Sequence, residues 1–71
     1  MQKISVVIAN RHQTSISLEK EFLDELKIIA QNKGQSINQL VTEIDNSREY
    51  NNLSSAIRVY VLQQLKSNTQ I

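Results

Sequence analysis

The chain has 71 residues, one glycine, no proline, no cysteine and a formal net charge of +1. This length predicts a single domain whose small core often needs a disulfide, a metal or oligomerisation for support. The absence of cysteine excludes a disulfide and indicates a reducing compartment, and one histidine leaves no plausible structural zinc site. No segment approaches the ~20 apolar residues of a membrane span. We therefore expect a cytoplasmic protein, with no metal, cofactor or membrane partner, that oligomerises.

Residues 4–8 are β-branched and apolar apart from Ser5, and Gln13, Ser15 and Ser17 alternate with Thr14, Ile16 and Leu18, which is typical of a strand with one buried face. The apolar residues Ile4, Val6, Ile8, Ile16 and Leu18 all fall on even positions, so one continuous strand would keep a single apolar face. The alternative is a break or a hairpin near residues 9–12, where no strong turn pair such as Asn-Gly occurs. We favour the single strand.

The period then changes to that of a helix, which we expect over residues 19–33. Its apolar stripe consists of Phe22, Leu26, Ile29 and Ala30. Gly34 follows where a helix commonly ends in a left-handed residue.

Two more helices are expected, over residues 37–45 and 53–66, within a single domain spanning residues 1–71. Ser36 and Gln39 match the capping box that starts a helix. The first of these helices has its apolar stripe at Ile37, Leu40, Val41 and Ile44. The stripe of the second consists of Leu53, Ala56, Ile57, Tyr60, Val61 and Leu65.

A single strand needs a partner, because its backbone amides and carbonyls cannot stay unpaired beside a core. The same strand of a second chain, antiparallel across a two-fold axis, is the simplest partner. The core of this homodimer would consist of Ile16, Leu18, Phe22, Leu26, Ile29, Leu40, Val41 and Ile44. Gln13, Ser15 and Ser17 would share the opposite face of a ribbon that fits the major groove of double-stranded DNA.

Residues 14–44, TSISLEKEFLDELKIIAQNKGQSINQLVTEI, with their Gly-x-Ser element at 34–36, resemble the ribbon-helix-helix family of DNA-binding regulators. Residues 52–65, NLSSAIRVYVLQQL, are similar to a subgroup with a third helix. The resemblance implies an α+β, mainly α fold: one N-terminal strand paired across a homodimer, followed by three short helices. It implies sequence-specific DNA binding, as in a small dimeric transcriptional repressor.

The resemblance also implies roles for individual residues. Gln13, Ser15 and Ser17 match the positions that contact bases, whereas Gln35, Ser36 and Ile37 match the phosphate-binding start of the second helix. Such a site suits an anion because the first amides of a helix are unpaired.

Relatives commonly carry Arg or Lys at one or more of the three strand positions, and this chain has neither there. Lys3 and Arg11 are the only cations in the first 18 residues. They either lie near phosphates or keep the strand soluble, and we assign Arg11 to the phosphate-contacting group.

No catalytic residue is predicted, because the chain has no Ser-His-acid set, no Cys-His pair and no glycine-rich phosphate loop. The alternative to DNA binding is therefore another non-enzymatic role. In it the dimer serves as an antitoxin-like or adaptor module that binds a protein partner, and binds DNA weakly or not at all. An uncovered apolar face on the helix at 53–66 would favour this alternative.

Overall fold

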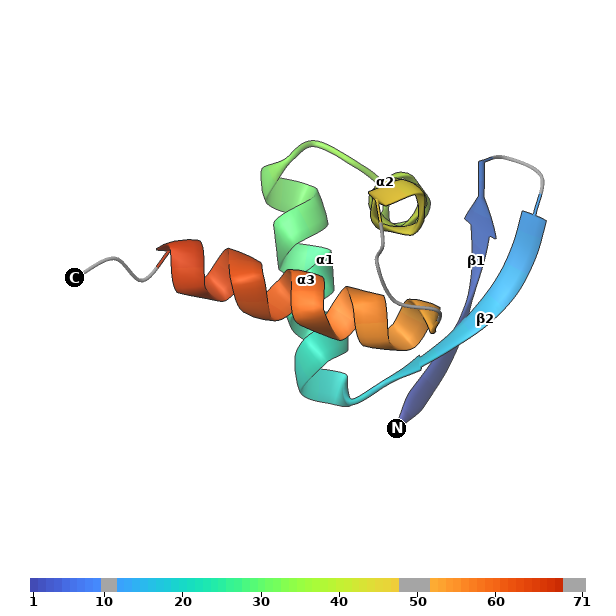
Figure 1. Cartoon of the computed structure of the whole chain (residues 1–71), viewed down its shortest axis with the longest axis horizontal. Helices are drawn as coiled ribbons and strands as arrows, with labels where there is room; N and C mark the ends of the chain where they lie inside the picture. The colour runs from blue at the N-terminus through green and yellow to red at the C-terminus, as the bar shows by residue number, and fades with distance from the viewer. Residues whose placement is uncertain (10–11, 48–51, 69–71) are drawn as a thin grey trace.

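The computed structural model describes residues 1–9, 12–47 and 52–68. Two strands, β1 (Gln2–Ile8) and β2 (His12–Leu18), precede three helices, α1 (Lys20–Asn32), α2 (Ile37–Ser47) and α3 (Leu53–Asn68). The β-hairpin lies at one side of the molecule, and α1 and α3 cross on the other side (Figure 1). The predicted α+β, mainly α fold is thus confirmed. Among the described helices, none is both long and apolar enough to cross a membrane.

The N-terminal region forms a hairpin, so the single continuous strand favoured from the sequence is wrong. β1 and β2 pair antiparallel, with Ile4 opposite Ile16 and Ile8 opposite His12. Folding back places the apolar residues of both strands on one face and satisfies the ladder hydrogen bonds within one chain. The chain reverses between Ile8 and His12, where Ala9 adopts a left-handed conformation with φ 54°.

α2 covers the outward edge of β1 at Val7 and Ala9. The amide of Val7 donates a 3.2 Å hydrogen bond to Oδ1 of Asn38, and the amide of Ala9 donates a 3.1 Å bond to Oγ1 of Thr42. These side chains replace the strand that would otherwise be needed on this side of the sheet. The helix therefore fixes the position of the hairpin as well as covering it.

The core lies between the even-numbered face of the hairpin and the three helices. Its buried side chains are Val6, Ile8, Ile16, Leu18, Leu23, Leu26, Ile29, Ala30, Leu40, Val41, Ile44, Ala56, Ile57 and Val61. Of the residues predicted for a dimer core, all but Phe22 are therefore buried within one chain. Phe22 is half-buried because the buried stripe of α1 runs through its neighbour Leu23.

The connection between α1 and α2 has the predicted turn. Gly34 has φ 68°, its amide bonds to the carbonyl of Gln31, and the amide of Gln35 bonds to the carbonyl of Ala30. This pair of bonds is the Schellman arrangement that ends a helix at a left-handed residue. α2 therefore begins at Ile37, only three residues after the glycine.

The register of the hairpin predicts opposite consequences for two adjacent valines. Val6 is 1% exposed, whereas Val7 is half-buried on the other face. We expect Val6→Ala to lower the free energy of unfolding by about 2 kcal/mol, through lost apolar burial and the cavity left behind. Val7→Ala should cost less than about 1 kcal/mol. Urea unfolding at one fixed protein concentration measures both, and equal losses would contradict the register.

Candidate nucleic-acid interface

Six odd-numbered residues of the hairpin point away from the helices and form its outer face. They face each other across the two strands in three pairs: Lys3 with Ser17, Ser5 with Ser15, and Val7 with Gln13. Val7 and Ser17 are half-buried and the other four are exposed. The structure thus brings the three predicted base-contacting residues together on one surface. The hairpin also brings Lys3, Ser5 and Val7 of β1 to this surface. A single extended strand would place these residues far from the base-contacting ones.

The three pairs are of the non-hydrogen-bonded type. The amide of Ser17 donates a 3.3 Å bond to Oγ of Ser54, so the backbone of Ser17 points away from β1. The amide of Val7 likewise bonds outward, to Asn38. The backbone amides of residues two apart in a strand point the same way, so all three pairs have the same non-hydrogen-bonded geometry. Side chains in such pairs are close, with Cβ atoms about 4.5–5.5 Å apart.

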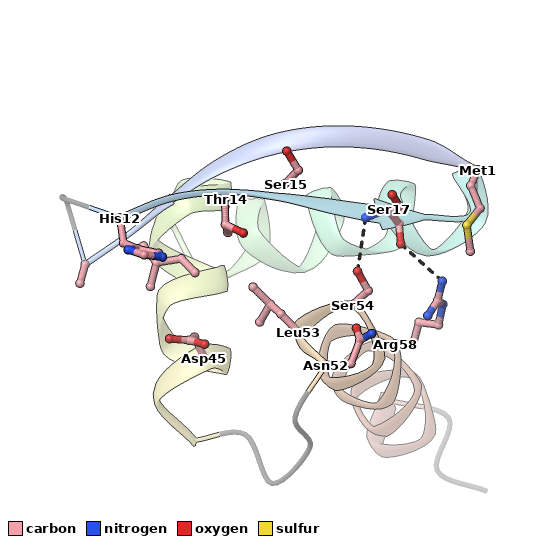
Figure 2. Close-up of a pocket in the computed structure, with 12 residues that line it drawn as sticks. Met1, His12, Thr14, Ser15, Ser17, Asp45, Asn52, Leu53, Ser54 and Arg58 are labelled. Carbon is pink, nitrogen blue, oxygen red and sulfur yellow. Dashed lines mark hydrogen bonds between the residues drawn. The ribbon is translucent and has the colours of Figure 1, made fainter.

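The outward edge of β2 is covered only at the end where Ser17 lies. There α3 supplies Ser54 and Arg58, which hydrogen-bond to the amide and carbonyl of Ser17 (Figure 2). Among the residues that the structure describes, no side chain covers the corresponding groups of Gln13 and Ser15. A cavity of about 860 Å³ lies beside this part of the edge, lined by residues of β2, α2 and α3 that include His12, Thr14, Ser15, Asp45, Leu53 and Ser54. This stretch of β2 can therefore accept another strand.

Arg58 holds the end of β2 to α3, a role that the sequence analysis did not predict. Its Nε donates a 2.8 Å bond to Oε1 of Glu19, and its Nη2 donates a 3.4 Å bond to the carbonyl of Ser17. The hydrogen bond from Arg58 holds the pKa of the Glu19 carboxyl below its ordinary value. The charge of Arg58 is thus already paired. No local pattern in the sequence marks this role, because Arg58 and Glu19 are 39 positions apart.

The N-terminus of α2 lies beside the outer face. Ser36 and Gln39 form the predicted capping box, with the amide of Ser36 bonded to Oε1 of Gln39 at 2.9 Å and the amide of Gln39 bonded to Oγ of Ser36 at 3.1 Å. The first-turn amides of Ile37 and Asn38 have no acceptor within the helix, as at any helix start. A hollow of about 330 Å³ joins this turn to Val7 and Ala9 of the hairpin.

The side chain of Gln35, the other predicted phosphate contact, is engaged elsewhere. Its Nε2 donates to Oε2 of Glu43, and Nζ of Lys33 donates a 3.1 Å bond to Oε1 of the same carboxylate. Both bonds hold the pKa of Glu43 below its ordinary value, the bond from Gln35 being the larger cause. At this helix start the predicted anion-binding groups are therefore the backbone amides and the hydroxyl of Ser36.

The remaining residues singled out in the sequence are Arg11, His12 and Tyr60. Arg11, the remaining predicted phosphate contact, lies outside the described residues. His12, at an even-numbered position at the start of β2, is exposed. Tyr60, expected in the core, is half-buried, and its hydroxyl accepts a 3.3 Å bond from Nζ of Lys33.

The ion pair between Arg58 and Glu19 predicts a change in acid sensitivity. The pKa of the Glu19 carboxyl is lowered in the folded state. The stabilisation of the fold by the ion pair is therefore present above the ordinary carboxylate pKa of about 4.3, and it is lost as pH falls through the lowered pKa. Arg58→Gln should therefore lower the urea midpoint more at pH 6 than at pH 3. Lys27→Gln, which removes an exposed cation from α1, serves as the charge-matched control. An equal loss of midpoint at both pH values for Arg58→Gln would contradict the pairing.

A family model described as a ribbon-helix-helix domain matches residues 1–65 of the chain. No curated protein and no solved structure gives a significant match. The matched region contains both strands of the hairpin, α1, α2 and most of α3. It therefore includes the whole outer face and the helix start beside it. On this evidence the chain belongs to the family of ribbon-helix-helix domains.

Proposed function

We propose that the protein is a sequence-specific DNA-binding protein, acting in the cytoplasm as a small dimeric transcriptional repressor that reads the major groove with its β-ribbon. The observation that carries this proposal is that Gln13, Ser15 and Ser17 of β2 share the outer face of the hairpin. Membership of the ribbon-helix-helix family supports DNA binding in general. No catalytic role is proposed.

The chemistry of the outer face suits the edges of bases. The amide of Gln13 can donate to and accept from one adenine, and a bidentate contact of this kind discriminates bases by about 1–3 kcal/mol. The hydroxyls of Ser15 and Ser17 can donate or accept, so they fit several bases and add less discrimination. Two copies related by a two-fold axis would read a palindromic site.

The dimer would form through the uncovered part of β2. Since β1 already occupies one edge of β2, the β2 strand of a second copy would pair with the other edge at Gln13 and Ser15. The resulting sheet would have the order β1, β2, partner β2, partner β1. This arrangement brings both copies of the three base-contacting residues to the centre of the sheet. The cavity beside β2 provides room for the second strand.

Phosphate contacts would come from the start of α2 on each side of the sheet. The free amides of Ile37 and Asn38 and the hydroxyl of Ser36 favour an anion there, and the positive end of the helix dipole adds to the attraction. Arg11 completes the proposed phosphate-contacting group, whereas Gln35 is left out because its amide bonds to the carbonyl of Ala30 and its Nε2 to Glu43. The net charge of +1 per chain gives little long-range attraction, so these local contacts carry the electrostatic part of binding.

DNA binding should depend on the outer face and on salt. We expect the triple variant Gln13→Ala, Ser15→Ala, Ser17→Ala to bind the DNA upstream of the protein's own gene at least about tenfold more weakly, because the bidentate contact of Gln13, worth about 1–3 kcal/mol, is removed together with the hydrogen bonds of the two serines. If a dimer contacts about four phosphates, log K should fall with log salt concentration at a slope near −3.6. Fluorescence anisotropy measures both quantities.

A matched control replaces exposed residues of the same types on the helices: Gln31→Ala, Ser47→Ala and Ser67→Ala. This control should bind DNA as the wild type does. Equal affinity of the two triple variants would contradict base contact by the outer face, and a slope near zero would contradict the mechanism.

The proposed dimer can be tested with two prolines. The amides of Ser15 and Ser5 both point away from the opposite strand of the hairpin, where proline is tolerated. Ser15→Pro should therefore leave the hairpin intact but give a monomer in analytical ultracentrifugation at micromolar concentration. Ser5→Pro, on the strand away from the proposed interface, should remain a dimer like the wild type. A monomeric wild type, or a dimeric Ser15→Pro variant, would contradict the proposed pairing of the two β2 strands.

A second candidate function is supported by exposed apolar residues on the helices. Leu62 and Leu65 of α3 are 52% and 39% exposed, and Ile28 of α1 is 48% exposed. Such residues favour the alternative of an adaptor or antitoxin-like module that binds a protein partner. Undetectable binding of the wild type to both upstream and random DNA at low salt would favour this candidate.

A further inference from the structure

We infer that Lys3 is a DNA-contacting residue that binds a phosphate at the rim of the major groove, beside the bases read by β2. This inference rests on the proposed function and identifies a residue of the same surface. It follows from the hairpin, because Lys3 belongs to β1 and lies directly opposite Ser17. On a single extended strand the 14 steps from Lys3 to Ser17 would span about 46 Å, at about 3.3 Å per residue.

The ammonium group of Lys3 is available for an anion. Lys3 is exposed on the outer face, and among the described residues it forms no ion pair. The nearby cation Arg58 is paired with Glu19, and two other lysines are also paired, Lys20 with Asp24 and Lys33 with Glu43. Lys3 is the only cation of the six residues that form the outer face.

The spacing of strands places Lys3 over the rim of the groove. Neighbouring strands lie about 4.8 Å apart, so in the proposed four-stranded sheet β1 lies about 7 Å from the two-fold axis. The major groove is about 12 Å wide, and its edge is therefore about 6 Å from the same axis. The two β2 strands consequently cover the bases, whereas β1 follows the sugar-phosphate backbone.

The chemistry of lysine fits this position. An ammonium is a compact, strongly hydrated charge on a flexible stem, and it binds phosphate as a point charge without requiring a fixed geometry. Lys3 would thus supply, from the neighbouring strand, the positive charge that Gln13, Ser15 and Ser17 lack. It would strengthen binding to every sequence by a similar factor, because phosphates carry no direct sequence information.

The test compares salt dependence in the full-length wild type, Lys3→Gln, Lys3→Arg and the charge-matched control Lys27→Gln. Each slope of log K against log salt concentration is measured by anisotropy on the upstream DNA and on a random duplex. Loss of one phosphate contact per chain should make the slope of Lys3→Gln less steep by about 1.8 per dimer. Its affinity should fall by a similar factor on both duplexes. Lys27→Gln and Lys3→Arg should keep the wild-type slope.

The possible failures are distinguishable. If Lys3→Gln keeps the wild-type slope while the Gln13, Ser15 and Ser17 triple variant loses binding, the inference about Lys3 is wrong and the proposed function stands. A loss of affinity confined to the upstream DNA would also overturn the assignment, since it would indicate a base contact. If the wild type binds neither duplex, the inference and the proposed function fail together. Circular dichroism and ultracentrifugation verify that each variant keeps the fold and the oligomeric state.

Discussion

The rest of the structure depends on the need of a strand's backbone for hydrogen-bond partners. β1 and β2 meet that need for each other, with Ile4 opposite Ile16, and so place two sets of apolar side chains on one face. This amphipathic hairpin gives α1, α2 and α3 a common surface on which to pack. Without the pairing, the even-numbered residues of β1 would not reach the core and the polar groups of β2 would remain unsatisfied.

The helices in turn decide which parts of the hairpin remain accessible. Asn38 and Thr42 of α2 hold one edge, while Ser54 and Arg58 of α3 hold the end of the other. These contacts leave the outer face and a short stretch of one edge uncovered. A small polar surface, rather than a deep enclosed pocket, is therefore what this fold offers to a partner. The major groove of DNA is wide enough to admit a two-stranded ribbon.

Much of the fold was predictable from the sequence because its signals are local. The helical period, Gly34 and the capping box at Ser36 each act within a few residues, and the structure shows the expected turn and cap. The hairpin was harder, since a shared even-numbered pattern allows both one long strand and two paired ones, and no strong turn pair decides between them. The roles of Arg58 and Lys3 depend on contacts over 39 and 14 positions in the chain, which periodicity cannot reveal.

The unequal covering of the two sheet edges has a consequence for self-association. A sheet with two open edges can add further copies without limit, as amyloid fibrils do. Here α2 covers the edge of β1 at Val7 and Ala9, whereas among the described residues no side chain bonds to the outward groups of β2 at Gln13 and Ser15. In the proposed dimer, each copy would fill this uncovered stretch of the other. The hydrogen bonds that seat the hairpin on α2 would then also hinder the addition of further strands beside Val7 and Ala9.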